Sequence, residues 1–331
     1  MTVPDFDKLF SRFPGIKVGV IGDVMLDTYW WGHVERISPE APVPVVAIDK
    51  KETRIGGAGN VALNLASLEA DVAVLTVLGE DEDGHSLRQM FQEKKIRTNY
   101  LLQSASRITT NKTRILSRNQ QMLRLDSEIT KDLTEQDEAA LLTQVASYIK
   151  NEKPAVIILE DYNKGVLSES VITKVIDLCK QNNVITTVDP KRKNFFAYKG
   201  VDIFKPNLKE VKDGLNLLIE EVNLATLKDI HQQLKEKIGH RISFITLSEK
   251  GVFYEDENTA RIIPSHIRNI ADVSGAGDTV IAVASLIYAA TGSISLMAEI
   301  ANLAGGLVCE EVGTAPIDKS KLLQECKTII N

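Results

Sequence analysis

Cysteine is scarce in this 331-residue chain: there are three, at positions 179, 309 and 326, far apart and without a C-x-x-C pair. Neither a disulfide framework nor a zinc ribbon is therefore expected. The five histidines show no H-x-x-x-H spacing, so the sequence offers no histidine metal site. The start of the chain also lacks the basic and apolar regions of a secretory signal, and we expect a cytoplasmic protein.

An excess of positive charge is also absent, because 39 Lys and Arg residues stand against 45 Asp and Glu residues, a net charge of −6. Nucleic acid and anionic membranes are therefore not expected as partners, and any bound anion must be held locally. Residues 279–298 carry no charge and reach the length of a membrane-spanning helix. Six hydroxyl-bearing side chains and the pair Gly292-Ser293 interrupt this run, so we expect two buried helices joined by a turn.

Short apolar runs alternate with helical periodicity along most of the chain, which indicates βαβ units on a mostly parallel sheet with helices on both faces. Strands are predicted at 17–23, 72–78, 155–160, 184–189, 201–205 and 242–247, followed by a pair at 251–255 and 259–263. The β-rich segments 27–55 and 107–126 have no helix between their strands, and three prolines exclude a helix from the first. We expect both segments to form a small β-sheet lid on a single domain, 1–331.

A glycine-rich segment, Gly57 to Ala62, matches the G-x-G-x-x-[GA] pattern of dinucleotide-binding proteins. That fingerprint belongs directly after the first buried strand, whereas these glycines follow the proline-rich segment. Tight packing of a helix on a sheet is a second interpretation. We favour a third, in which the glycines let a polar ligand approach the backbone and Asn60 offers its amide to the ligand's hydroxyls.

A second motif, Asp272-Val-Ser-Gly-Ala-Gly-Asp278, precedes a long apolar helix. Small residues at a helix N-terminus leave N–H groups free to bind a phosphate. Asp278 is either a carboxylate that stabilises the helix N-terminus or a base that takes a proton from an attacking hydroxyl. We favour the base, because a carboxylate beside an anion site serves stability poorly. No G-x-x-x-x-G-K-[ST] motif is present, which excludes a P-loop mechanism.

Together, Gly56 to Asn60 and Asp272 to Asp278 resemble the two signatures of the PfkB/ribokinase family of carbohydrate kinases, and the resemblance extends over essentially the whole chain. It implies a ribokinase-like three-layer α/β/α sandwich that uses ATP and Mg²⁺. Further segments resemble the family's heptose 7-phosphate kinases, namely 22–27, 36–45, 116–121, 124–126, 161–165 and 189–191. These enzymes phosphorylate the C1 hydroxyl of D-glycero-β-D-manno-heptose 7-phosphate on the ADP-heptose route to lipopolysaccharide core.

The resemblance also implies a role for each matching residue. Asp278 matches the catalytic base, and the N–H groups of Gly275, Ala276 and Gly277 match the anion hole for the transferring phosphoryl group. The residues that match the ATP and Mg²⁺ site are Asn207 and Glu210, which organise Mg²⁺ through water, and Thr246, Ser248, Glu249, Gly251 and Asn302. The residues that match the sugar site are Asp23, Asp27, Gly56, Gly57, Asn60 and Asp161. Asp272 and Gly313 fall where some relatives hold a monovalent cation such as K⁺.

A sugar phosphate needs a cationic clamp for its distal phosphate, and the candidates are Lys112, Arg114, Arg118, Arg124 and Lys191. We expect Arg118 or a neighbour to bind this phosphate; the alternative is that these arginines are solvated or ion-paired across the lid. Trp30 and Trp31 suggest a homodimer through the lid. The chain lacks the H-x-G-H motif of a nucleotidyltransferase, so only the kinase step is expected. The remaining alternatives are a kinase of another sugar or sugar phosphate, a catalytically silent sugar-sensing or structural protein, and an NAD-dependent oxidoreductase.

Overall fold

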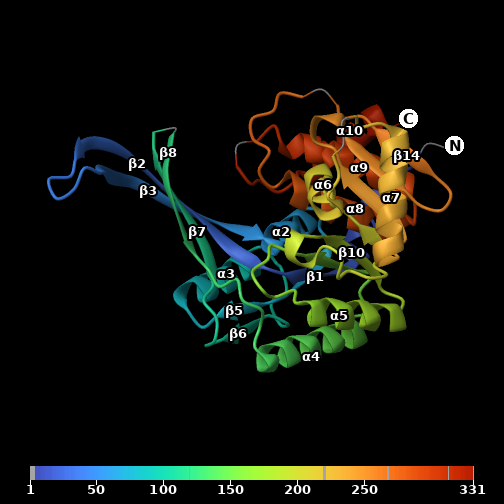
Figure 1. Ribbon diagram of the computed structural model, residues 1–331, viewed down its shortest axis with the longest axis horizontal. Coiled ribbons are helices and arrows are strands. Elements are labelled where there is room, and N and C mark those ends of the chain that lie inside the picture. Colours follow the sequence, from blue (N-terminus) through green and yellow to red (C-terminus); the bar gives the residue numbers. More distant parts are fainter. Residues whose placement is uncertain (1–3, 119, 219–220, 267, 312, 331) are drawn as a thin grey trace.

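An eight-stranded sheet forms the centre of the computed structural model, which describes residues 4–118, 120–218, 221–266, 268–311 and 313–330 (Figure 1). Its strand order is β14-β13-β12-β11-β10-β9-β1-β4. The strands are β1 (Lys17–Gly22), β4 (Asp71–Leu75), β9 (Val156–Glu160), β10 (Ile185–Asp189), β11 (Ile203–Phe204), β12 (Ile242–Thr246), β13 (Val252–Glu255) and β14 (Ala260–Ile263). The pairings from β4 to β12 are parallel, whereas β13 and β14 add an antiparallel edge.

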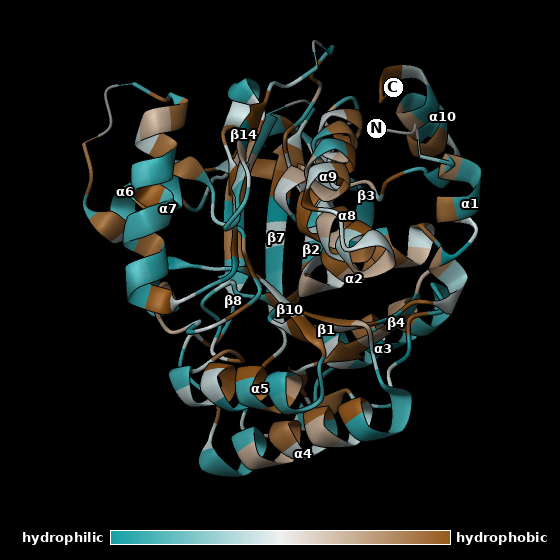
Figure 2. Ribbon diagram, turned by 90° about the vertical axis from the view of Figure 1, so that its right-hand side faces the viewer, coloured by the Kyte–Doolittle hydropathy of each residue, from teal (hydrophilic) through white to brown (hydrophobic). Residues whose placement is uncertain are grey.

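Helices cover both faces of this sheet (Figure 2). One core lies beneath α1 (Phe6–Phe10), α2 (Ala58–Ser67), α3 (Glu82–Glu93), α8 (Ala276–Thr291), α9 (Ile294–Val308) and α10 (Lys319–Ile329). The other lies beneath α4 (Glu135–Glu152), α5 (Glu169–Gln181), α6 (Leu208–Leu215) and α7 (Leu224–Ile238). Strand β1 serves both cores, since Val18 and Val20 point into the first and Ile21 into the second. The predicted three-layer α/β/α sandwich is confirmed.

A second sheet of four strands forms the lid, in the order β3-β2-β7-β8, and extends away from the body (Figure 1). It consists of β2 (Val24–Ile37), β3 (Pro44–Gly57), β7 (Thr110–Ser117) and β8 (Gln120–Ser127). The lid strands β2 and β3 together run from residue 24 to 57, slightly beyond the predicted 27–55, and β3 passes directly into α2. The predicted separate lid is otherwise observed.

Two predicted strands differ from the structure. The segment predicted as one strand at 72–78 divides into β4 and β5 (Val77–Gly79), and β5 pairs with β6 (Leu102–Ser104) in a separate small sheet. The break falls at Thr76, whose hydroxyl donates a hydrogen bond to the Gly22 carbonyl at 2.8 Å, which ties this residue to the end of β1. The strand predicted at 201–205 is only two residues long.

The uncharged run at 279–298 forms most of α8 and the start of α9, as predicted, and the chain turns at Gly292, which is left-handed with φ of 67°. In the described ranges, no helix combines the length and apolar character needed to cross a bilayer. The three cysteines are free thiols.

Candidate active site

Polar side chains gather where the parallel strands end, the edge at which open α/β sheets usually bind ligands. Glu160 is the last residue of β9 and Asp189 the last of β10, and both carboxylates are buried. The first turn of α8 faces this edge, since a Cβ placed on Gly277 would lie 3.8 Å from Asp189 Oδ2. The site therefore combines strand-end carboxylates with the N-terminus of a helix.

Asp278 lies in the first turn of α8 and is only 6% exposed. Gly275 caps this helix in a left-handed conformation with φ of 79°, which glycine adopts without strain. Asn60 Nδ2 donates a hydrogen bond to Asp278 Oδ2 at 2.7 Å, and the Tyr162 hydroxyl donates to Oδ1 at 2.8 Å. Burial raises the pKa of Asp278 to about 6, and these two donors oppose the rise. A carboxylate of this kind is ionised at neutral pH and well suited to accept a proton.

The N–H groups of Gly275, Ala276 and Gly277 belong to the N-terminus of α8, where the first-turn amides have no intrahelical acceptor. The Ala276 N–H donates a hydrogen bond to the Val273 carbonyl at 3.3 Å. The structure therefore brings the predicted anion hole and the predicted base together in a single helical turn. An anion on these amides would lie beside the Asp278 carboxylate, the arrangement needed for attack by a hydroxyl on a bound phosphoryl group.

The early glycines connect the lid with the body. Gly57 has φ of 59°, and a Cβ there would clash with the Asp23 carbonyl. A Cβ on Gly56 would clash with the Asp27 carboxylate. Asn60 follows in the first turn of α2 and reaches Asp278. Because the segment continues lid strand β3 and does not follow a strand of the parallel sheet, it lacks the context of a dinucleotide fingerprint.

Asp23 holds the loop that follows β9. Its Oδ2 accepts the Tyr162 and Lys164 N–H groups at 2.9 and 3.0 Å, and its Oδ1 accepts the Val166 N–H at 3.0 Å. Asp161 lies in the same loop and is 1% exposed; its Oδ2 accepts a hydrogen bond from the Tyr198 hydroxyl at 2.8 Å. Burial raises the pKa of Asp161 to about 6. Asp23 therefore holds the backbone of the loop from outside it, whereas Asp161 belongs to the loop and also accepts the Asn163 N–H at 2.7 Å.

Two lysines neutralise the carboxylate at the end of β10. Lys205 Nζ lies 2.8 Å from Asp189 Oδ2, and Lys191 Nζ lies 3.0 Å from Asp189 Oδ1. Lys191 also contacts Glu210 Oε1 at 2.8 Å. The structure therefore places Lys191, a sugar-site candidate, against the predicted Mg²⁺ residue Glu210. Glu160 beside them has no hydrogen-bond partner for either carboxylate oxygen among the described residues, and burial raises its pKa well above the usual range.

The predicted nucleotide residues lie at the ends of β12 and α6. Asn207 and Glu210 form a capping box at the start of α6, in which each side chain accepts a hydrogen bond from the other's N–H at 2.8 Å. Asn207 also forms a β-bridge with Thr246, the last residue of β12. The N-x-x-E motif is thus both a helix cap and the neighbour of the predicted nucleotide strand.

The turn after β12 contains the remaining nucleotide candidates. Ser248 and Glu249 form a 3-10 turn, and Gly251 follows with φ of 92°, where a Cβ would clash with the Ile263 carbonyl. Asn302 of α9 donates a hydrogen bond to the Pro264 carbonyl at 2.9 Å. The structure therefore brings these residues together around one turn at the antiparallel edge of the sheet.

Asp272 and Gly313, predicted to share a cation site, are in contact although 41 residues separate them. The Gly313 N–H donates to Asp272 Oδ2 at 3.0 Å, and the Ser274 N–H and hydroxyl donate to Oδ1 at 2.9 and 2.8 Å. A Cβ on Gly313 would clash with Arg54 Nη1 of the lid, so a lid guanidinium reaches this loop.

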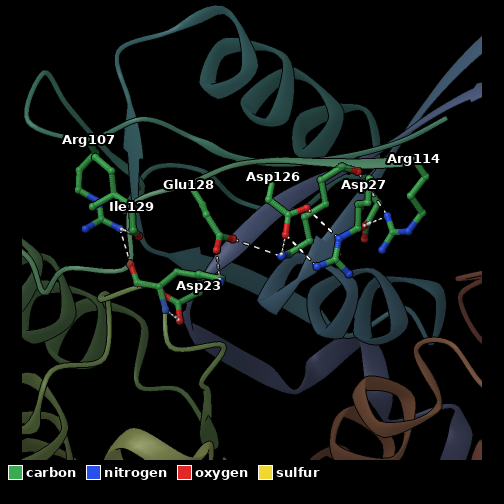
Figure 3. A network of polar contacts seen from close by, with 10 residues as sticks. Asp23, Asp27, Arg107, Arg114, Asp126, Glu128 and Ile129 are labelled. Carbon is green, nitrogen blue, oxygen red and sulfur yellow. Dashed lines mark hydrogen bonds and ion pairs between the residues drawn. The ribbon is translucent and has the colours of Figure 1, made fainter. Parts of the chain in front are cut away.

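The lid cations are mostly ion-paired (Figure 3). Arg114 Nη1 contacts Asp27 Oδ1 at 2.6 Å, and Arg124 forms two hydrogen bonds of 2.9 Å with Asp126. Arg118 lies instead at the β7–β8 turn, at the end of the lid remote from the body (Figure 1). Within one chain, the structure does not bring Arg118 together with Asp278.

Lys112 continues this network towards the body, with Nζ 3.3 Å from Asp126 and 3.2 Å from Glu128. Glu128 in turn lies 2.8 Å from Lys164 Nζ of the loop that Asp23 holds (Figure 3). The ion pairs therefore connect the lid with the loop after β9.

No role was predicted from the sequence for Tyr162, Lys205, Glu160, Asp189 or Arg54. The strand-end positions of Glu160 and Asp189 are a signal that was available, because carboxyl ends of parallel strands share one edge. The other three depend on side-chain directions and on strand register, which periodicity does not supply.

Comparisons with known proteins identify the family of this chain and its fold. The profile of the family described as pfkB family carbohydrate kinase matches residues 16–321. The bifunctional protein HldE of Aliarcobacter butzleri is 40% identical over 309 residues, which cover 93% of this chain and 63% of the relative. HldE of Syntrophotalea carbinolica is 38% identical over 323 residues, covering 96% and 64%. The chain thus spans a little under two thirds of these relatives.

Solved structures show the same fold. Phosphofructokinase-2 from Escherichia coli in complex with potassium has a TM-score of 0.78 at 16% identity, covering 96% of this chain and all of that one. Ribokinase from Arabidopsis thaliana complexed with ribose and ATP has a TM-score of 0.73 at 17% identity, covering 93% and 99%. The fold is therefore ribokinase-like. Because the family profile matches most of this chain, the chain belongs to the pfkB family of carbohydrate kinases and is a phosphotransferase that acts on a sugar hydroxyl.

Proposed function

We propose that the chain transfers the γ-phosphoryl group of ATP to the C1 hydroxyl of D-glycero-β-D-manno-heptose 7-phosphate, giving the 1,7-bisphosphate in ADP-heptose and lipopolysaccharide core biosynthesis. The observation that carries the chemistry is Asp278, a buried carboxylate with a pKa of about 6 in the first turn of α8. The heptose assignment is supported by the HldE relatives at 38–40% identity. The alternative is a kinase of the same family that acts on another sugar or sugar phosphate.

In the proposed step Asp278 accepts the proton of the C1 hydroxyl of the sugar. The oxygen of that hydroxyl attacks the γ-phosphorus of ATP. The bond from that phosphorus to the β–γ bridging oxygen breaks, and ADP leaves. The N–H groups of Gly275, Ala276 and Gly277 stabilise the charge on the transferring group. Asn60 orients the carboxylate. The lid covers the sugar and excludes water, which would otherwise take the phosphoryl group.

The residues near α6 suit a hydrated Mg²⁺. This ion prefers oxygen ligands and keeps several of its waters. Asp189 and Glu210 are ion-paired with lysines, and no group of three or more acidic, His or Cys side chains among the described residues could hold a metal ion directly, so contact would be through water. Both oxygens of Glu160 are buried without a hydrogen-bond partner among the described residues. When bound, Mg²⁺ supplies positive charge to the ATP phosphates; we propose that Asn207 and Glu210 hold its waters.

For Asp272 and Gly313 we propose a monovalent cation, tested by comparing activity in K⁺ and in tetramethylammonium.

We propose that the distal phosphate binds at Arg54 and Arg114 on the inner lid face. Strand register places both on the face that carries Asp27. Each guanidinium carbon lies 5.2 Å from the centre of the Tyr29 ring, so the two cations flank one aromatic platform. Arg54 uses only its Nε for Glu52 within the described chain, which leaves Nη1 and Nη2 for an anion. Arg118 remains a candidate only if a second chain brings it to the site.

The outer lid face, which is the face opposite to Asp27 and Arg114, supports the proposed homodimer. Leu123 and Leu125 of β8 are 52% and 47% exposed, and register places them on the same side of the sheet as Ile115. Exposed leucines in neighbouring register positions favour burial against a second copy of the lid. Light scattering of the wild type and of a Leu123→Asp, Leu125→Asp variant tests this assembly: a dimer that becomes monomeric supports it.

An ADP-release assay across sugars and sugar phosphates tests the function most directly. We expect turnover with heptose 7-phosphate at a kcat/KM well above those for ribose, fructose and fructose 6-phosphate. A higher kcat/KM with another acceptor would transfer the assignment to that sugar, while absence of turnover with every acceptor would contradict a kinase acting on any of them.

A further inference from the structure

We infer that Tyr162 is a positioning residue for the proposed base: its phenol hydroxyl fixes the orientation of the Asp278 carboxylate and stabilises the carboxylate charge. This inference rests on the proposed role of Asp278. It concerns a residue that the sequence comparison left without a role, although Tyr162 lies next to Asp161 in a motif shared with the heptose kinases.

The geometry carries the inference. The Tyr162 hydroxyl lies 2.8 Å from Asp278 Oδ1, and Asn60 Nδ2 lies 2.7 Å from Oδ2. The two donors come from opposite parts of the site, one from the loop after β9 and the other from α2. Because each holds a different oxygen, together they fix the plane of the carboxylate. A carboxylate offers about four acceptor positions, so two remain for the hydroxyl of the sugar.

Hydrogen bonds to the backbone hold the loop that carries Tyr162. Its own N–H is bound by Asp23, which also accepts the N–H groups of Lys164 and Val166. The buried Arg107 donates to the carbonyls of Lys131 and Lys164, and so also holds this loop. The backbone is therefore fixed at several points around Tyr162, and the phenol is presented to Asp278 from a stable base.

The charges around Asp278 show why a donor is needed there. Asp189 contributes negative charge from the end of β10, while Lys205 contributes positive charge. Burial raises the pKa of the neighbouring Glu160 well above its usual range. Lys191 lies with its Nζ 5.6 Å from the centre of the Tyr162 ring. Burial, together with the Asp189 charge, disfavours the ionised form of Asp278, and the hydrogen bonds from Asn60 and Tyr162 oppose both effects.

The test is Tyr162→Phe in the full chain, which removes the hydroxyl but keeps the ring beside Lys191. We expect kcat at the alkaline plateau to fall roughly tenfold, because the carboxylate is less well oriented. The acid limb of the kcat profile should move to higher pH by about one to two units, since the charged form loses a hydrogen bond. KM for ATP and for the sugar should change less than about twofold.

Tyr100→Phe is the matched control, because the Tyr100 hydroxyl also contacts a carboxylate, Glu152 Oε1 at 3.3 Å, away from the site. This variant should keep the kcat, both KM values and the pH profile of the wild type. Thermal unfolding of both variants tests whether a general loss of folding causes the change in kcat, which an unchanged midpoint of unfolding would exclude. A merely structural role for Tyr162 would lower the midpoint of unfolding but would leave the acid limb in place.

The outcomes separate the two claims. If Asp278→Asn is nearly inactive but Tyr162→Phe has the wild-type acid limb and kcat, the inference about Tyr162 is wrong and the base remains. If Asp278→Asn turns over normally, the proposed base is wrong, whatever Tyr162→Phe does. A displaced acid limb together with a reduced kcat in Tyr162→Phe supports the positioning role.

Discussion

Asn60 of α2 donates a hydrogen bond to Asp278 of α8, with Nδ2 2.7 Å from Oδ2, across 218 positions of sequence. The contact joins the early motif, Gly56 to Asn60, to the late motif, Asp272 to Asp278, and each motif contributes one of the two side chains. It explains why the two motifs form a single site although most strands of the central sheet and two lid strands lie between them in the chain.

The first prediction concerns the carboxylate in that contact. Asp278→Asn keeps the shape of the side chain but cannot accept the proton, so kcat should fall by roughly 10² to 10⁴ with little change in the affinity for ATP. Steady-state ADP release and ATP binding measured by calorimetry check both parts. Asp229→Asn, an exposed change on α7, is the control and should retain full activity.

The second prediction is a pH dependence. Because the pKa of Asp278 is raised to about 6, the carboxylate is ionised above that pH and protonated below it. We expect kcat of the wild type to be constant at neutral pH and to fall about tenfold per pH unit below 6. Asp161 also has a pKa of about 6, so the assignment is checked in Asp161→Asn, whose kcat should keep the same limb. A kcat profile without a limb between pH 5 and 7 would contradict Asp278 as the base.

The third prediction concerns stability. Lys205 and Asp189 are 2% and 4% exposed, and their charges lie 2.8 Å apart. Lys205→Met removes one partner and leaves a buried carboxylate with Lys191 alone, so the free energy of unfolding should fall by about 3 kcal/mol. Urea unfolding measures the loss, and the exposed Lys199→Met should leave the midpoint unchanged. Equal unfolding midpoints for Lys205→Met and Lys199→Met would show that the Lys205–Asp189 ion pair does not stabilise the fold.

The fourth prediction separates the two faces of the lid. Arg54→Met should raise KM for a sugar phosphate at least tenfold and leave KM for the corresponding unphosphorylated sugar unchanged, because only the former carries a distal anion. Lys51→Met is the control, since Lys51 pairs with Trp30 in register and lies on the opposite face of β3. An equal effect of Arg54→Met on both sugars would assign Arg54 to lid structure and not to phosphate binding.

Much of the fold was predictable because its signals are local. Apolar strand-length runs predicted the parallel sheet. Prolines 39, 42 and 44 excluded a helix from the lid, but Pro39 and Pro42 lie in the turn between β2 and β3 and only Pro44 lies in a strand. The division of strand 72–78 was not predictable, because it depends on a hydrogen bond from Thr76 to the distant Gly22 carbonyl. The site was predictable where a motif marks it, as at Asp278. Arg54 and Tyr162 required the lid register and the course of the loop after β9.

Strand β3 ends at Gly57 and α2 begins at Ala58, so no connecting loop separates the lid from the helix that carries Asn60. Gly57 itself forms the last lid pairing and also caps the turn of helix that carries Asn60. In the proposed kinase, we therefore expect the position of the lid over a sugar and the orientation of the Asp278 carboxylate to be coupled through the Asn60 amide.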